Sequence, residues 1–231
     1  MASTDSARVI DSLAERKYLR GLLWATPPGS PVVLVGSWAR GTANARWSDI
    51  DVLVMGEHDG PLPPPRIQLI SITPKELRRR VGEGDDFAQW ALRFGVPLAG
   101  RQLWDELRDR LLSDAPWPKA ASQLKQARKK LETASDLFRM GDLPAAEEEI
   151  RFALSHLARA ELLSHRIFPL SRQELPVQLR EAGNTRLAEM MARANSVTPM
   201  SKSAVRAAIS NVDQILRSSE APVRKATPSG G

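Results

Sequence analysis

Short apolar runs alternate with amphipathic segments through the first half of the chain. Short runs of β-branched and other apolar residues are typical of buried strands, whereas apolar residues spaced three and four apart are typical of helices. The pattern predicts strands at 31–35, 50–55, 66–72 and 96–98, and helices from Thr4 or Asp5 to Trp24 and over 36–44, 74–81 and 85–94. This half is therefore expected to form a small mixed sheet with flanking helices.

The second half has apolar residues at helical spacing only. From Leu124 to Phe138, and again from Ile150 to Ala160, they recur at steps of three and four, and Gly141 separates the two helices. Further helices are expected at 173–182, at 186–195 and after residue 199. The sequence thus predicts an α+β protein with a first domain over 1–115, an all-α bundle over 116–219 and a disordered tail over 220–231.

The candidate chemistry lies where the first two predicted strands end and begin. Gly36 and Ser37 follow the first strand, so backbone N–H groups and a hydroxyl are available there for an anion such as phosphate. Asp49 and Asp51 are two residues apart, which puts both carboxylates on one face of the second strand while Ile50 faces the core. Carboxylate oxygens suit Mg²⁺, which keeps its other positions for water and substrate phosphates. The four polar residues predict a site for one or two Mg²⁺ ions and a phosphate-bearing substrate.

Gly36-Ser37 with Asp49-x-Asp51 resembles the signature of the polymerase-β nucleotidyltransferase superfamily, and the run Gly-Ser-Trp-Ala-Arg-Gly-Thr-Ala is most similar to its small MNT-type members. The resemblance implies that Asp49 and Asp51 are the catalytic metal ligands and that Gly36 and Ser37 bind the nucleotide. Arg40 is a candidate for contact with a triphosphate oxygen or for a surface position on the helix. It implies transfer of a nucleoside monophosphate from a Mg²⁺-bound triphosphate, with ATP as the expected donor. The acceptor would be a protein, an RNA or a small molecule, and some relatives belong to toxin–antitoxin pairs.

The resemblance also implies a third carboxylate on a neighbouring strand, and here the sequence departs from it. The matching position in the predicted strand 66–72 is Gln68, which is neutral and cannot take a proton from an attacking hydroxyl. Three readings remain: weakened or absent catalysis, a base brought by the substrate or a partner, or a carboxylate from the trio Glu147, Glu148 and Glu149. A non-catalytic nucleotide-binding or antitoxin-like protein is the alternative function.

The helical half resembles the HEPN architecture, and the segment Phe168-Pro169-Leu170-Ser171-Arg172 after its second long helix adds to the likeness. The resemblance implies a homodimer through the helical domain as one arrangement. Some HEPN domains are ribonucleases with an Arg-x4-6-His motif, for which this chain offers Arg151 with His156 or Arg159 with His165. Because Arg151 and His156 are about 140° apart on a helix, their spacing favours a structural histidine at the edge of the core.

Charge and composition narrow the partners. Residues 1–115 hold 15 basic and 15 acidic side chains, and residues 116–231 hold 18 and 12, so the second half favours anionic partners such as RNA, an acidic protein or the triphosphate. The chain has no cysteine, which excludes disulfides and thiol nucleophiles. Without a long apolar run or a signal segment, a cytoplasmic protein with no membrane partner is expected. Trp38, directly after Ser37, is a candidate for base stacking or for core packing.

Overall fold

The computed structural model describes residues 13–43, 48–56, 60–196 and 198–220. Contacts divide the chain into two compact units, of which the first comprises Met1–Lys119 and Leu170–Glu174 and the second comprises Ala120–Pro169 and Leu175–Gly231. Of the helices in the described ranges, none combines the length and the apolar composition that a transmembrane span needs.

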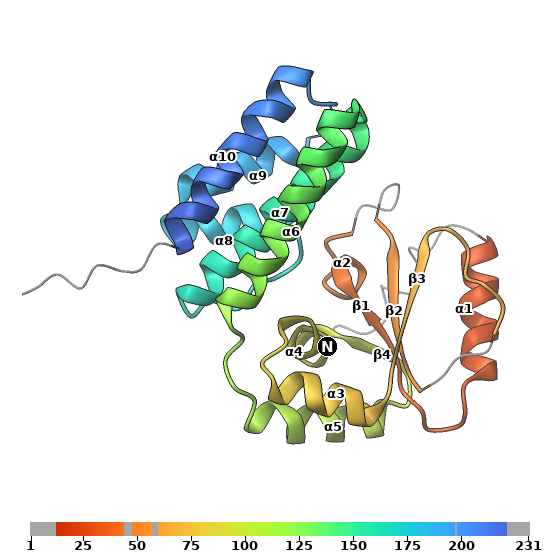
Figure 1. Ribbon diagram of the computed structural model, residues 1–231. Coiled ribbons are helices and arrows are strands. Elements are labelled where there is room, and N and C mark those ends of the chain that lie inside the picture. Colours follow the sequence, from red (N-terminus) through yellow and green to blue (C-terminus); the bar gives the residue numbers. More distant parts are fainter. Residues whose placement is uncertain (1–12, 44–47, 57–59, 197, 221–231) are drawn as a thin grey trace, which may run out of the picture. The chain divides into compact units, whose positions relative to one another are not determined.

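A four-stranded sheet in the order β3-β2-β1-β4 is the centre of the first unit (Figure 1). Its strands are β1 (Val32–Val35), β2 (Ile50–Met55), β3 (Ile67–Ile72) and β4 (Val96–Ala99). β1 pairs antiparallel with β2 and β4, whereas β2 and β3 run parallel. The edge position of β4 accommodates Pro97, because only one side of an edge strand must donate to the ladder. The expected mixed sheet is confirmed.

The two central strands are buried on both faces, and alternation decides which residues lie on which face. One face packs against helix α1 (Leu13–Ala25), and the shared core cluster contains Leu19, Leu22, Val32, Leu34, Trp38, Ile50, Val52, Val54 and Ile67. The intervening residues 33 and 35 of β1 and 51 and 53 of β2 therefore lie on the opposite face. Asp51 is the one charged side chain among these four positions.

Three helices, α3 (Pro74–Gly82), α4 (Asp86–Phe94) and α5 (Arg101–Ser113), pack against one another on the side of the sheet away from α1 (Figure 1). Thr73 caps α3 and Asp85 caps α4, each by accepting a backbone N–H of the first turn. The first unit thus has helices on both sides of its sheet, and their buried apolar side chains include Leu77, Leu92 and Trp104.

Two helices of the first unit differ from the sequence prediction. Within the segment 36–44, for which a phosphate turn and a short helix are predicted, helix α2 spans only Gly36–Ala39 and the chain turns at Gly41, whose φ is +69°. Helix α5 was not predicted, although its buried Trp104 and Leu107 have helical spacing. Residues 1–12, where the predicted first helix begins, lie outside the described residues.

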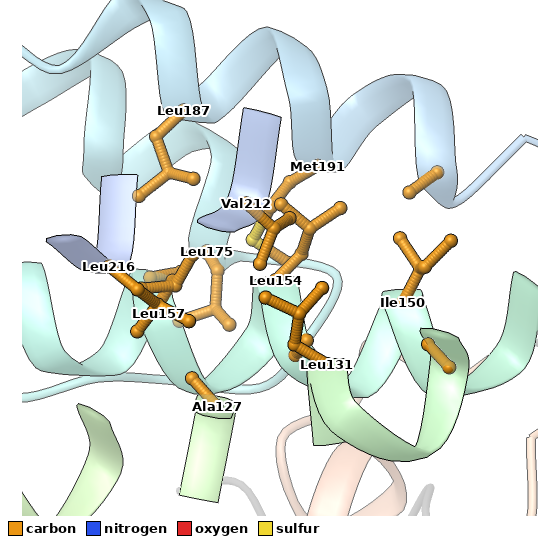
Figure 2. Close-up of a cluster of buried hydrophobic side chains, with 14 of the residues drawn as sticks. Ala127, Leu131, Ile150, Leu154, Leu157, Leu175, Leu187, Met191, Val212 and Leu216 are labelled. Carbon is orange, nitrogen blue, oxygen red and sulfur yellow. The ribbon is translucent and has the colours of Figure 1, made fainter. Parts of the chain in front are cut away.

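The second unit consists of helices α6 (Ala120–Met140), α7 (Leu143–Ser164), α8 (Leu175–Glu181), α9 (Thr185–Ala194) and α10 (Lys202–Glu220). Figure 2 shows their common core, in which α6 and α7 contribute Ala127, Leu131, Ile150, Leu154 and Leu157, and the other helices contribute Leu175, Leu187, Met191, Val212 and Leu216. The turn at Gly141 adopts φ +87°, and α7 then begins with Asp142 accepting the Ala145 N–H.

The predicted fold class, an α+β unit with a small mixed sheet followed by a helical bundle, is confirmed. The tail predicted for 220–231 lies outside the described residues from residue 221 onward, and Glu220 is the last residue of α10.

Candidate functional site

Gly36 directly follows β1 and is the first residue of α2, and its position requires glycine for two reasons. Its φ is +70°, a region that other residues adopt only with strain. A Cβ atom built there would also lie well inside van der Waals contact with Oδ2 of Asp51. The missing side chain of Gly36 therefore makes the space in which the Asp51 carboxylate lies.

Asp51 lies on β2, between the neighbouring strands β1 and β3. In the ladder it is paired with Val35 on β1 and with Gln68 on β3, so all three residues sit side by side at one end of the sheet. Burial raises the pKa of the Asp51 carboxyl to about 6, and the negative charge of Asp49 adds to the rise. Ionised Asp51 is thus held in an unfavourable environment that a cation would relieve.

Asp49 precedes β2 and is exposed to solvent. Its Oδ2 accepts a hydrogen bond of 3.0 Å from Nε2 of Gln68. Gln68 is thus adjacent to both acids, since it faces Asp51 across the ladder and holds Asp49 with its amide. The structure places a neutral amide at the position where the resemblance implies a third carboxylate.

Ser37 and Arg40 lie in and just after α2, and both are partly buried. The carbonyl of Ser37 accepts the Thr42 N–H at 3.0 Å, which closes the turn that follows the helix. Val35 at the N-cap has no side-chain acceptor, so the first N–H groups of α2 need another partner.

Arg40 already has an anionic partner in this structure. Its Nη2 donates to Oε1 of Glu174 at 2.9 Å, and its guanidinium lies 4.9 Å from the ring centroid of Phe94. Burial raises the pKa of Glu174, but hydrogen bonds from Arg40 and Ser171 outweigh it and the pKa is lowered overall. A phosphate at Arg40 would compete with Glu174 for the guanidinium.

Trp38 is buried at 6% exposure and belongs to the core cluster of the sheet. Its indole Nε1 donates to the carbonyl of Ser48 at 3.4 Å. The Trp38 ring therefore packs in the core and is not an exposed surface on which a base could stack.

The donor set fits a small, hard cation. Asp49 and Asp51 offer carboxylate oxygens from one end of the sheet, and the Gln68 amide is next to both. Burial and, after it, the negative charge of Asp49 raise the pKa of Asp51, so a bound cation would stabilise the ionised carboxylate. Among the described residues, no three His, Cys, Asp or Glu side chains gather as a metal cluster, so substrate phosphates and water would have to complete a Mg²⁺ site.

The acidic trio of the second unit is bound within that unit. Glu147 accepts from Arg151 and from the Met200 N–H, and Glu148 also pairs with Arg151. Glu149 pairs with Lys130 at 3.0 Å. All three carboxylates thus have structural partners in the bundle.

The ribonuclease motif considered for the bundle has structural contacts as well. Nε of Arg151 donates to the carbonyl of Ala194 at 2.6 Å, which ties α7 to the end of α9. Nδ1 of His156 lies 2.7 Å from Oε1 of Gln123 on α6. Arg151 thus ties α7 to the end of α9, and His156 lies against α6, as a structural histidine at the edge of the core would.

Two residues near the site were missed by the sequence reading. Arg66 donates to the carbonyl of Ser48 at 2.9 Å, immediately before Asp49, and Glu15 on α1 lies 3.6 Å from Arg66. Their pairing could not be predicted from a local pattern, because each residue comes from a different segment of the chain. Only the burial of Glu15 in the structure points to a paired carboxylate, since Glu is almost never buried unless it is paired.

Residues 15–131 of the chain match the family model of the Nucleotidyltransferase domain. The chain belongs to the nucleotidyltransferase domain family. The match covers the whole described sheet, the Gly36–Ser37 turn and both Asp49 and Asp51, and it extends into α6. Nucleotidyl transfer is therefore the general chemistry of the first unit, in agreement with the sequence prediction.

A solved structure, the nucleotidyltransferase-like protein from Exiguobacterium sibiricum 255-15, is 15% identical, with 89% of this chain and 74% of that chain covered and a TM-score of 0.45. No curated protein matches the chain. The family model identifies the nucleotidyltransferase domain alone, and the HEPN likeness of the bundle stays a prediction.

Proposed function

We propose that the first unit transfers a nucleoside monophosphate from a Mg²⁺-bound nucleoside triphosphate to an acceptor, with ATP as the expected donor. The observation that carries the proposal is the pair of carboxylates at one end of the sheet, where Asp51 lies against Gly36 and Asp49 is bound by Gln68. In the reaction the oxygen of an acceptor hydroxyl bonds to the α-phosphorus and its proton passes to water, the bond from that phosphorus to the β-phosphate oxygen breaks, and pyrophosphate leaves.

Each site residue has a distinct role in this proposal. Asp49 and Asp51 hold the metal, which when bound neutralises phosphate charge and stabilises the attacking and leaving oxygens. Gly36 leaves room for the Asp51 carboxylate and offers, with Ser37, N–H and O–H donors to the phosphates. Arg40 binds a phosphate oxygen after exchanging its carboxylate partner Glu174 for the substrate.

The acceptor is a protein, an RNA or a small molecule. The excess positive charge in residues 116–231 favours an anionic acceptor over a polycation. As a further part of the proposal, the second unit is a HEPN-like bundle that can pair with a second copy of the chain, and a toxin–antitoxin system is the biological setting.

Gln68 favours a second candidate, a non-catalytic nucleotide-binding or antitoxin-like protein. An amide cannot accept the proton of an attacking hydroxyl, and its N–H donates to Asp49 instead. In this alternative the site binds a triphosphate without transferring any part of it. The two candidates share the same ligands and differ in whether a covalent product forms.

The experiment that separates them follows the α-phosphate. The purified protein is incubated with Mg²⁺ and each of the four nucleoside triphosphates, labelled at the α-phosphate, in a cleared cell lysate. The Asp49→Asn/Asp51→Asn double variant is the control. Label that moves to a macromolecule or small molecule with the wild type only supports transfer and identifies the acceptor class. Binding of a triphosphate without any transfer of label would favour the second candidate, and no binding would contradict both.

A further inference from the structure

The peptide carbonyl of Ser48, which directly precedes Asp49, accepts two side-chain hydrogen bonds. Arg66 donates to it at 2.9 Å and Trp38 at 3.4 Å. Ser48 is itself buried, at 8% exposure. Two long side chains from different elements thus converge on a single backbone oxygen beside the exposed Asp49.

Arg66 holds the chain on both sides of Asp49. Its guanidinium binds the carbonyl of Ser48, and its own carbonyl accepts the N–H of Ile50 at 2.7 Å. The two peptide groups that flank Asp49 are therefore both fixed to one residue. Gln68, two residues further along the same chain segment, binds the Asp49 carboxylate itself.

Arg66 is in turn held by a buried acid. Oε1 of Glu15 lies 3.6 Å from Nη1 of Arg66, and the Glu15 side chain is 5% exposed. A carboxylate this deeply buried is retained at a cost unless a cation pairs with it. The ion pair links α1 to the start of β3 and orients the guanidinium toward Ser48.

We propose that Arg66, oriented by Glu15 and assisted by Trp38, is a positioning residue that sets the place of the Asp49 carboxylate beside Asp51. The inference rests on the proposed function, in which these two acids hold the metal. Asp49 precedes the first residue of β2 and is exposed, so the ladder of β2 alone does not fix its backbone. Groups that orient a metal ligand commonly change metal affinity by about 10- to 100-fold when they are removed.

The test uses the full chain with four variants. Arg66→Met removes the guanidinium, but it leaves Glu15 buried without that cation and risks unfolding. The double variant Glu15→Gln/Arg66→Met removes both charges and still removes the donor to Ser48. Arg66→Lys keeps the positive charge beside Glu15 with a single donor group. Arg79→Met is the control, because it removes another arginine that pairs with carboxylates, here Glu76 and Glu83 on or next to α3.

Two measurements are made on each folded variant. The first is Mn²⁺ affinity, by calorimetric titration, as a probe of the metal site. The second is the side-chain amide NMR signal of Gln68 in metal-free protein, which reports on the hydrogen bond to Asp49. We expect the double variant to bind Mn²⁺ about tenfold more weakly with a shifted Gln68 signal, Arg66→Lys to fall between it and the wild type, and Arg79→Met to match the wild type.

Different results would contradict the proposed function and the positioning role of Arg66. If the wild type binds Mn²⁺ and the double variant binds it equally, with an unshifted Gln68 signal, Arg66 does not position Asp49 although the metal site stands. If the wild type binds no Mn²⁺, the proposed function fails, and the Gln68 signal alone decides whether Arg66 positions the acid. A shift of that signal in Arg79→Met as large as in the double variant would also overturn the inference, because the effect would then not be local.

Discussion

The carboxylate of Asp51 occupies the space that the Cβ of any other residue at position 36 would need. Gly36→Ala therefore adds a steric clash to the strain of φ +70°. We expect the variant to lose about 2–4 kcal/mol of unfolding free energy and to lose divalent-ion binding, because Asp51 must move. Chemical denaturation and Mn²⁺ titration measure the two effects.

Gly41→Ala is the matched control for that prediction. Gly41 has nearly the same φ, +69°, but a Cβ there would meet none of the described residues within 4 Å. It should cost only the backbone strain, about 1 kcal/mol, with ion binding intact. Equal losses in the two variants would show that the Asp51 contact has no effect of its own.

Asp51→Asn should stabilise the metal-free protein at neutral pH. The pKa of Asp51 is raised from 3.8 to about 6 in the folded state, so the folded protein holds this proton more tightly than the unfolded chain does. The protonated carboxyl of Asp51 therefore makes its full contribution to stability below pH 4, and this contribution is lost as the pH rises from about 4 to about 6. Removing the charge should therefore add on the order of 2 kcal/mol at pH 7, which thermal or urea unfolding against pH would measure.

Asp85→Asn provides the comparison for this prediction. Asp85 pairs with Arg80 at 2.9 Å and caps α4, so neutralising it removes a favourable interaction. The two identical substitutions should change stability in opposite directions. A loss of stability in Asp51→Asn at pH 7 would contradict the picture of a strained carboxylate.

Gln68→Asp should strengthen the metal site, because it places a third carboxylate opposite Asp51 in the β2–β3 ladder. We expect Mn²⁺ to bind about tenfold more tightly, any transfer activity to rise, and the metal-free protein to become less stable through repulsion among the acids. Gln68→Asn, which is equally short but neutral, should not bind the ion more tightly. If both variants behave alike, the charge at position 68 does not limit the site.

Glu174→Gln should release Arg40 for the substrate. Glu174 holds the Arg40 guanidinium at 2.9 Å, and the neutral amide would hold it less strongly. Triphosphate affinity, measured by calorimetry with Mg²⁺, should increase about threefold or more in Glu174→Gln and decrease in Arg40→Met. If neither variant changes the affinity, Arg40 does not contact the phosphates.

The parts of the site that lie along single strands could be predicted from the sequence. The apolar runs define β1, β2 and β3, and alternation along β2 places Asp51 on the face opposite Ile50 and Val52. Gln68 was matched to the third acidic position by its place in a predicted strand, and the parallel register sets it opposite Asp51.

Contacts between distant segments could not be predicted in this way. Arg40 and Glu174 are 134 positions apart, and Glu15 reaches Arg66 from another element. Trp38 could equally have been a stacking platform, and only its burial against the sheet decides the matter. Helix α5 is different, because the spacing of Trp104, Leu107 and Leu111 by three and four is a helical pattern from which it could have been predicted.

The central claim concerns which phosphorus atom is attacked, and paired labels test it most directly. Wild-type protein and the Asp49→Asn/Asp51→Asn variant are incubated with Mg²⁺ and lysate, once with ATP labelled at the α-phosphate and once with ATP labelled at the γ-phosphate. Nucleotidyl transfer predicts that only the wild type attaches the α label to an acceptor, while the γ label leaves in pyrophosphate. Labelling from the γ-phosphate that the wild type adds and the double variant does not, or α labelling that is equal with the two proteins, would contradict the account.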